Sequence, residues 1–376
     1  MSADDAGSIV FAGGGTGGHI SPGIAIAEEV AALAPRFRCV FACSTRAVDA
    51  RMLAHVGADF VPISAEGFSL EPRRLLRFLR AYAAGRREAR ELLAARRARL
   101  VVSLGGFVTA PVAAAARSLG VPLLLVNLDA TPGKANRMVA RHAARTLSAC
   151  ATPSMPRFAE RIVGMPIRSV ARAALPPGES RRRFGLEPGM RTLLVTGASQ
   201  GAASLNELVL MLLRQERPAF GGWQALHLVG QADPAPIEEA YRAAGVRAAV
   251  LPFVHEMGLA WGAADLALSR AGANSVAEAV VNDVPTVFAP YPYHKDLHQR
   301  HNAEPYARDG VAVLADDLIE PARNMATLGA ALLELMTVDP RREAMRAALQ
   351  ARPREAAART VAEVAVAMAA ESTARA

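Results

Sequence analysis

The sequence predicts an α/β protein of two domains, each built on a parallel sheet covered by helices. Strand-like apolar segments alternate with helical patterns in both halves of the chain, which is typical of parallel sheets covered on both faces. A glycine-rich loop follows the first strand of each half and precedes a helix. The 376 residues, 52% of them hydrophobic, are enough for two cores.

The first half begins with a strand expected at residues 9–12, the loop Gly13-Gly14-Gly15-Thr16-Gly17-Gly18-His19, and a helix expected at residues 22–33. Such a loop lets backbone N–H groups and a helix N-terminus approach an anion, most often a phosphate. Further strands of this half are expected at residues 38–42, 60–63, 100–104, 122–126 and 146–149.

The second half repeats this organisation around the loop Gly197-Ala198-Ser199-Gln200-Gly201-Ala202. Two phosphate-type loops favour two domains facing a shared cleft and an enzyme that joins two phosphorylated substrates. A proline-rich segment separates the halves and predicts a linker. The predicted domains are residues 1–166 and 191–350, with a hinge at 167–190 and a C-terminal helix and tail at 351–376. Strands are expected at residues 192–196, 224–229, 248–251, 266–269, 286–289 and 311–314.

Charge and cysteine content limit the class of protein. The net charge of +8 indicates an anionic partner, which could be nucleic acid, a membrane surface or a phosphorylated substrate. The three cysteines lack the spacing of a disulfide framework or a zinc site. The acidic N-terminus does not resemble a signal peptide, so we expect a cytoplasmic protein. The uncharged residues 100–116 are interpreted as a strand, a glycine turn and a helix rather than a membrane span.

Residues 71–100 contain ten arginines interleaved with leucine, phenylalanine and tyrosine. A basic helix with an apolar edge can lie in an anionic lipid interface. Alternatively, the helix is solvated and its apolar edge packs on the sheet. Nucleic acid is not expected as a partner, because no aromatic stacking platform accompanies the arginines.

Gly13, Gly15 and Gly18 also fit the spacing of a dinucleotide-binding loop. That interpretation requires an acidic residue after the second strand to bind the ribose. The chain has Arg46 there, which would suit the 2′-phosphate of NADP. An NADP enzyme therefore stays open as an alternative, which the second glycine loop disfavours.

A second polar constellation lies in residues 264–278. A strand ends near Ser269, a turn of small residues opens a helix near Asn274, and Glu278 follows about one turn later. A helix N-terminus can receive a phosphate, and a carboxylate one turn inside can accept hydrogen bonds from both ribose hydroxyls. The alternative is a capping box of Ser275 and Glu278 with no ligand.

Four ordered motifs resemble the MurG family of peripheral membrane N-acetylglucosaminyltransferases, in glycosyltransferase family 28. They are residues 14–19, residues 197–202 with Leu205-Asn206, residues 269–273 with Glu278, and residues 290–302. The resemblance implies a GT-B fold of two Rossmann-like domains and an inverting transfer of N-acetylglucosamine from UDP-GlcNAc to the 4-hydroxyl of the MurNAc of lipid I, forming lipid II. It implies no cofactor and no bound metal. It also implies a peripheral position on the cytoplasmic face of the inner membrane, a polyprenyl diphosphate acceptor, and contact with other cell-wall synthesis proteins.

The same resemblance implies roles for residues of the second half and the hinge in binding the donor. Glu278 would bind the ribose, Ala273, Asn274 and Ser275 would meet the phosphates, and Phe253 with Val254 would contact the uracil edge. Ser199 and Gln200 would lie at the diphosphate, and Arg168 would reach the donor from the hinge. His298 and Gln299 occupy the place of two glutamines near the sugar, and His298 departs from the family pattern.

The first half would bind the acceptor. His19 is the candidate catalytic base, since an imidazole can accept a proton near neutral pH, and its alternative role is a hydrogen bond that closes the loop. The family pattern His-Glu-Gln-Asn is replaced here by Val126-Asn127-Leu128-Asp129. Asp129 is therefore a second candidate base, or a cap of the turn before Pro132. The acceptor diphosphate would be bound by Gly14, Gly15, Thr16, Gly17, Gly18, Gly105 and Gly106.

This replacement leaves other functions open. The chain could use the same donor on a different lipid or secondary-metabolite acceptor. It could be a 2-epimerase of UDP-GlcNAc, although a clear acidic catalytic set is missing. A nucleotide-sugar-binding subunit without turnover is a third alternative, which the retention of His19, Glu278 and Gln299 disfavours.

Overall fold

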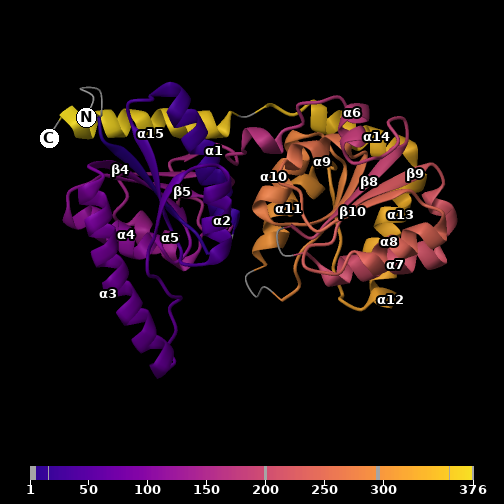
Figure 1. The fold of residues 1–376 in the computed structure, drawn as a ribbon, viewed down its shortest axis with the longest axis horizontal. Coiled ribbons are helices and arrows are strands. Elements are labelled where there is room, and N and C mark those ends of the chain that lie inside the picture. The colour runs from indigo at the N-terminus through magenta and orange to yellow at the C-terminus, as the bar shows by residue number, and fades with distance from the viewer. Residues whose placement is uncertain (1–5, 16, 199–200, 294–296, 355, 375–376) are drawn as a thin grey trace. The chain divides into compact units, whose positions relative to one another are not determined.

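The chain folds into two units. The computed structural model describes residues 6–15, 17–198, 201–293, 297–354 and 356–374. The first unit contains the chain up to Arg168 and also the residues after Arg354, so it includes the C-terminal helix. The second unit runs from Ser169 to Arg354 (Figure 1).

The first unit is built on a seven-stranded sheet in the order β3-β2-β1-β4-β5-β6-β7. All neighbouring strands pair in parallel. The strands are β1 (Ser8–Gly13), β2 (Arg38–Cys43), β3 (Asp59–Pro62), β4 (Ala98–Gly105), β5 (Leu123–Asn127), β6 (Arg145–Ser148) and β7 (Arg161–Ile162). The helices are α1 (Gly17–Leu33), α2 (Ala47–His55), α3 (Pro72–Ala95), α4 (Thr109–Ser118), α5 (Lys134–Ala140) and α15 (Ala357–Ala374).

Alternate residues of β1 serve two cores, because successive side chains of a strand point to opposite faces. Ile9 and Phe11 lie in the cluster that α1 and α15 cover. Val10 and Ala12 lie in the cluster formed with α3 and α4. Figure 1 shows the C-terminal helix α15 beside α1, so the two ends of the chain cover the same face of this sheet.

The second unit has a six-stranded parallel sheet in the order β10-β9-β8-β11-β12-β13. Its strands are β8 (Arg191–Thr196), β9 (Trp223–Leu228), β10 (Ala248–Leu251), β11 (Leu266–Arg270), β12 (Thr286–Ala289) and β13 (Val313–Leu314). Its helices are η1 (Ser169–Ala171), α6 (Pro177–Arg183), α7 (Ala203–Gln215), η3 (Arg217–Phe220), α8 (Ala235–Ala244), α9 (Met257–Ala263), α10 (Ala273–Val281), α11 (His298–Arg308), α12 (Pro321–Asn324), η4 (Met325–Gly329), α13 (Ala330–Thr337) and α14 (Asp339–Gln350).

The sheets, their strand positions and the strand–loop–helix structure of residues 100–116 are confirmed. Three details differ from the prediction. Helix α1 begins at Gly17 rather than at residue 22, with Pro22 inside it. The short edge strand β7 was not predicted, because two exposed residues carry no alternation. Helix α6 lies in the predicted linker, within the second unit. Among the described residues, no helix has the length and apolarity needed to cross a bilayer.

The arginine-rich segment forms the long helix α3, and its two halves have different surroundings. Near its C-terminal end Ala89, Leu92 and Leu93 are buried against the sheet. The main-chain N–H and hydroxyl of Ser64 donate to the Glu88 carboxylate at 2.7 and 2.9 Å, which ties this half to the loop after β3. The N-terminal half extends away from the sheet in Figure 1. The expectation that the apolar edge packs on the sheet therefore holds only for the C-terminal half.

Candidate active site

The first glycine loop connects β1 to α1 and has a conformation that only glycine adopts easily. Gly14 and Gly15 have φ values of +150° and +96°. The loop is held by Asp49, in the first turn of α2. One oxygen of this fully buried carboxylate accepts hydrogen bonds from the N–H of Gly15 at 2.7 Å and the hydroxyl of Ser44 at 2.5 Å. A single aspartate in a helical pattern gave no signal in the sequence, and its role was missed.

Arg46, considered above for a 2′-phosphate, is engaged with this loop instead. Its Nη1 donates to the carbonyl oxygen of Gly15 at 2.6 Å. The arginine thus closes the loop from the side of β2, and this contact removes the main support for an NADP site. Thr16, expected at the acceptor diphosphate, lies outside the described residues.

The loop after β4 lies directly against the first glycine loop. A side chain on Gly106 would collide with the carbonyl oxygen of Gly14, and one on Gly105 would come within 3.0 Å of the His19 ring. Both glycines also have positive φ values, +110° at Gly105 and +84° at Gly106. The structure therefore brings together the predicted acceptor-binding glycines, with Gly17 and Gly18 in the first turn of α1.

His19 lies in the same turn, against Gly105. Burial lowers the pKa of its imidazole, and the charges of Asp129 and Asp49 partly oppose this effect. A backbone hydrogen bond with Gly14, in the first glycine loop, also opposes the effect of burial. A neutral imidazole at this position can accept a proton near neutral pH, and the nearby carboxylates would stabilise the resulting cation. Asp129, the second candidate base, is thus close enough to influence His19.

In the second unit, helix α10 follows β11 and carries the predicted donor residues. Its N-cap is Gly272, so Ala273, Asn274 and Ser275 form its first turn. Ser275 is therefore inside the helix and cannot serve as the N-cap of a capping box, so that interpretation is wrong. Glu278 follows less than two turns from the start of the helix. The Trp261 indole donates to its Oε2 at 2.9 Å, a contact that the sequence did not predict.

The C-terminal end of α10 is also anchored by a single side chain. The Asn282 amide nitrogen donates to the carbonyl oxygens of Glu278 and Ala171, each at 2.8 Å. Its Oδ1 accepts from the N–H of Ala173 at 2.7 Å. Asn282 therefore fixes the helix that carries Glu278 against the segment through which the chain enters the second unit.

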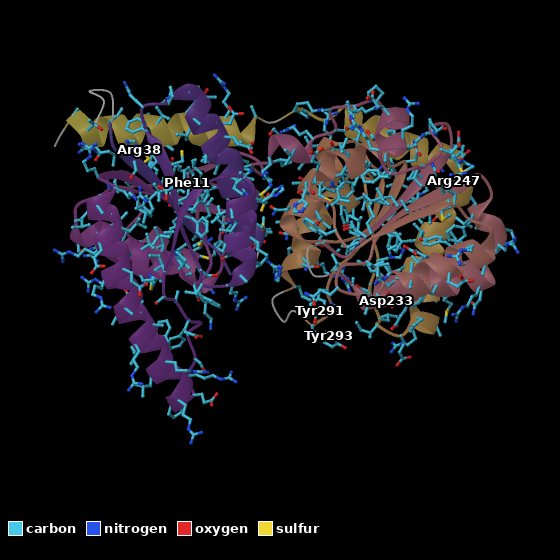
Figure 2. All side chains as sticks on the ribbon, viewed as in Figure 1. Phe11, Arg38, Asp233, Arg247, Tyr291 and Tyr293 are labelled. Carbon is cyan, nitrogen blue, oxygen red and sulfur yellow. The ribbon has the colours of Figure 1, made fainter. Side chains whose placement is uncertain are left out.

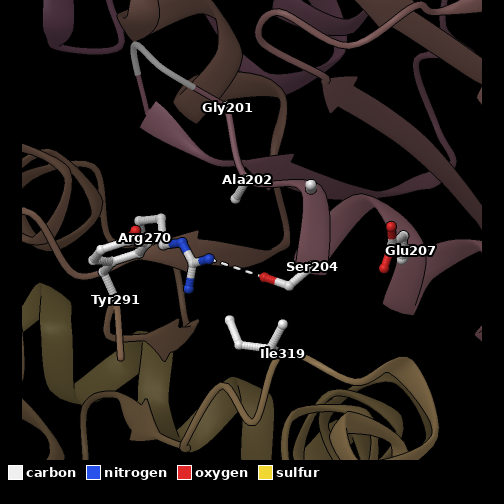
Figure 3. A pocket seen from close by; sticks show the side chains of 8 residues that line it. Gly201, Ala202, Ser204, Glu207, Arg270, Tyr291 and Ile319 are labelled. Carbon is white, nitrogen blue, oxygen red and sulfur yellow. Dashed lines mark hydrogen bonds between the residues drawn. The ribbon is translucent and has the colours of Figure 1, made fainter. Parts of the chain in front are cut away.

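A pocket of about 270 Å³ lies at the start of α7, beside the second glycine loop (Figure 3). The Arg270 guanidinium lines it, donates to the Ser204 hydroxyl at 2.9 Å and pairs with Asp317 at 2.7 Å. Burial alone would raise the pKa of Asp317, but hydrogen bonds from Ser204 and Asn324 and the charge of Arg270 hold it below its usual value. The pocket is thus lined by a fixed and charge-compensated polar network.

The remaining predicted donor residues occupy separate positions. Phe253 is half-exposed after β10 and packs edge-on against His255, while Val254 is buried. His298 opens α11, and the Gln299 side chain accepts from the N–H of Tyr291 at 2.9 Å. Arg168 belongs to the first unit, where it pairs with Glu28 at 3.7 Å. Ser199 and Gln200 lie outside the described residues.

Figure 2 shows the exposed side chains of Tyr291 and Tyr293 at the edge of the second unit. Their ring centroids are 5.5 Å apart, and the Arg270 guanidinium lies 5.6 Å from the Tyr291 ring. Tyr291 therefore lines the pocket and packs against Tyr293.

Two parallel-sheet domains, each with a glycine-rich loop at the carboxyl end of its first strand, are the architecture of the GT-B class of glycosyltransferases. Residues 9–148 match the glycosyltransferase family 28 N-terminal domain, and residues 192–361 match the glycosyltransferase family 28 C-terminal domain. The crystal structure of Acinetobacter baumannii MurG superposes with a TM-score of 0.70 at 23% identity, covering 96% of this chain and 99% of that one.

Relatives of similar length share more of the sequence. One from Mycobacterium sp. (strain KMS) is 35% identical over 380 residues, covering 97% of this chain and 96% of the relative. Another from Geobacter sp. (strain M21) is 33% identical over 346 residues, covering 87% of each. Both are named UDP-N-acetylglucosamine–N-acetylmuramyl-(pentapeptide) pyrophosphoryl-undecaprenol N-acetylglucosamine transferase. The chain belongs to this family, the MurG family of glycosyltransferases.

Proposed function

We propose that this enzyme transfers N-acetylglucosamine from UDP-GlcNAc to the 4-hydroxyl of the MurNAc of lipid I, forming lipid II with inversion at the anomeric carbon. The observation that carries the proposal is the pair of loop sites, one in each unit, within a chain that is related over nearly its whole length to transferases named for this reaction.

The second unit would bind the donor. The Glu278 carboxylate, oriented by Trp261, would accept hydrogen bonds from the ribose hydroxyls. The first turn of α10 presents backbone N–H groups and the positive end of the helix dipole to the diphosphate. The base and the sugar would be contacted by Phe253, Val254, His298 and Gln299. Arg168, the last residue before the second unit begins, would also contact the donor.

The first unit would bind the acceptor diphosphate at the paired glycine loops. His19 would take the proton from the acceptor 4-hydroxyl as its oxygen attacks C1 and UDP leaves. The negative charge on the leaving UDP would be offset by loop N–H groups and helix N-termini, without a cofactor or a bound metal.

The N-terminal half of α3 would place the enzyme on the cytoplasmic face of the inner membrane. Leu76 and Leu79 are 49% and 52% exposed, and Phe68 and Leu70, just before the helix, are exposed as well. Arginines are interleaved with these apolar side chains. Each arginine near an anionic surface contributes on the order of 1 kcal/mol, and the leucines can enter the acyl boundary.

The test is UDP release from UDP-GlcNAc by the purified chain, with a short-chain lipid I analogue in detergent. Glu278→Ala should weaken UDP binding, whereas His19→Ala should keep UDP binding and mainly lower turnover. UDP release by the wild-type enzyme that does not depend on the lipid I analogue would contradict the proposal. If the enzyme transferred the sugar to another polyprenyl diphosphate sugar and not to lipid I, its acceptor would be a different one. The replacement of the family pattern at residues 126–129 is compatible with that outcome.

A further inference from the structure

Asn127, one of the four residues at which the chain departs from the family pattern, belongs to a buried network with Asn136 and Ser148 near His19. The Asn127 amide nitrogen donates to the carbonyl oxygen of Asp129 at 2.7 Å and to the hydroxyl of Ser148 at 3.0 Å. Asn127 Oδ1 accepts from the Asn136 amide nitrogen at 3.1 Å. The Ser148 hydroxyl donates to the carbonyl oxygen of Cys150 at 2.7 Å.

The direction of every hydrogen bond in this network is fixed. The carbonyl oxygens of Cys150 and Asp129 can only accept. The Ser148 hydroxyl spends its one proton on Cys150, so it must accept from Asn127. Asn127 therefore presents its amide nitrogen to Ser148 and Asp129 and its oxygen to Asn136. As a result, Asn136 must donate through its nitrogen, and its own oxygen points away from the network.

That oxygen has no hydrogen-bond partner among the described residues, although Asn136 is only 7% exposed. It lies 3.2 Å from the position that a side chain of Gly105 would occupy, and His19 Nε2 lies 3.0 Å from the same position. Two hydrogen-bonding atoms thus flank Gly105, in the loop assigned to the acceptor diphosphate. A buried acceptor without a donor is destabilising, and a hydrogen-bond donor on a ligand would remove that cost.

We propose that Asn136 Oδ1 accepts a hydrogen bond from a hydroxyl or amide N–H of the acceptor sugar, and that Asn127 is the positioning residue that orients it. This inference rests on the proposed function. It gives the replaced residue a role, because a carboxylate at position 127 has no proton to donate to Ser148 or Asp129. The Asn127 amide and the unpartnered Asn136 oxygen together form a binding site for a hydrogen-bond donor of the acceptor sugar.

The test compares steady-state kinetics of Asn136→Ala and Asn127→Asp with the wild type, with both substrates varied. Asn136→Ala should raise KM for the acceptor about tenfold or more while KM for UDP-GlcNAc changes less than twofold, because Glu278 and the first turn of α10, which would bind the donor, lie in the other unit. Asn127→Asp should show a smaller rise in acceptor KM. That rise should shrink as the pH is lowered, since a protonated carboxyl regains one donor, while KM for UDP-GlcNAc should stay within twofold at each pH, which a general structural defect would not allow.

An acceptor KM unchanged in Asn136→Ala, or a parallel rise of both KM values, would overturn the inference and leave the proposed function intact. Absence of transfer by the wild-type enzyme to a lipid I analogue would instead overturn the proposed function. The variants would then be compared on the polyprenyl diphosphate sugar that the wild type accepts, where equal acceptor KM values would still overturn the inference.

Discussion

Acid should destabilise the second unit through a buried histidine. His227, on β9, is enclosed by two polar partners: its Nε2 lies 3.0 Å from Asn206 Oδ1, and its Nδ1 lies 3.2 Å from the Tyr241 hydroxyl. An amide oxygen only accepts, so Nε2 carries the proton and Nδ1 accepts from the tyrosine. Asn206 belongs to α7, the helix after the second glycine loop, so this neutral histidine helps to hold that helix on the sheet.

The magnitude follows from the pKa. Burial lowers the pKa of His227 to about 3, from 6.5. The unfolded chain therefore binds the proton at higher pH than the folded chain does. The stabilising contribution is complete above pH 6.5 and declines as the pH falls from 6.5 towards 3. The loss approaches about 1.4 kcal/mol per pH unit, which gives about 2 kcal/mol between pH 7 and pH 5.

The assay is urea unfolding followed by tryptophan fluorescence at pH 7 and pH 5. Both tryptophans of the chain, Trp223 and Trp261, are buried in the second unit, so the signal reports that unit. His227→Gln removes the titrating group and should flatten the pH dependence by about 2 kcal/mol. His255→Gln, at an exposed histidine of the same unit, is the matched control. Equal pH dependence of wild type and His227→Gln would refute the reasoning.

Three other outcomes are expected. Trp261→Phe removes the hydrogen bond to Glu278 and should raise the Kd for UDP about three- to tenfold by calorimetry; an unchanged Kd would mean that the indole does not orient the carboxylate. Asp49→Asn leaves the hydrogen-bond donors of the loop poorly satisfied and should lower the free energy of unfolding of the first unit by about 1–3 kcal/mol. The measurement is urea unfolding followed by circular dichroism, and a loss below about 0.5 kcal/mol would count against the anchoring role of Asp49. Leu76→Ser with Leu79→Ser should reduce cosedimentation with anionic vesicles severalfold without changing UDP affinity, and vesicle binding equal to that of the wild type would contradict membrane docking by α3.

The sequence predicted the two sheets because hydrophobic alternation and glycine punctuation are local signals. The predicted strand ends lie within a few residues of the observed ones. The loop glycines and His19 were also predicted to lie together at one edge of the first sheet. The predicted start of α1 was wrong because the glycine run was interpreted as a loop. The last residues of that run form the first turn of the helix.

The contacts that orient the site could not be predicted, because they join residues far apart in the chain. Asp49 holds Gly15 across 34 positions, and Trp261 holds Glu278 across 17. Neither residue belongs to a recognisable motif. The division of α3 into a buried and an exposed half was likewise hidden, since its arginines run along the whole helix.

The most direct test of the proposed reaction is UDP release from UDP-GlcNAc, measured with and without a short-chain lipid I analogue. Release by the wild-type enzyme should depend on the analogue. His19→Ala should lower this release with UDP binding retained, and Glu278→Ala should lower it together with UDP binding. UDP binding without analogue-dependent release by the wild-type enzyme would contradict its assignment as the transferase that forms lipid II.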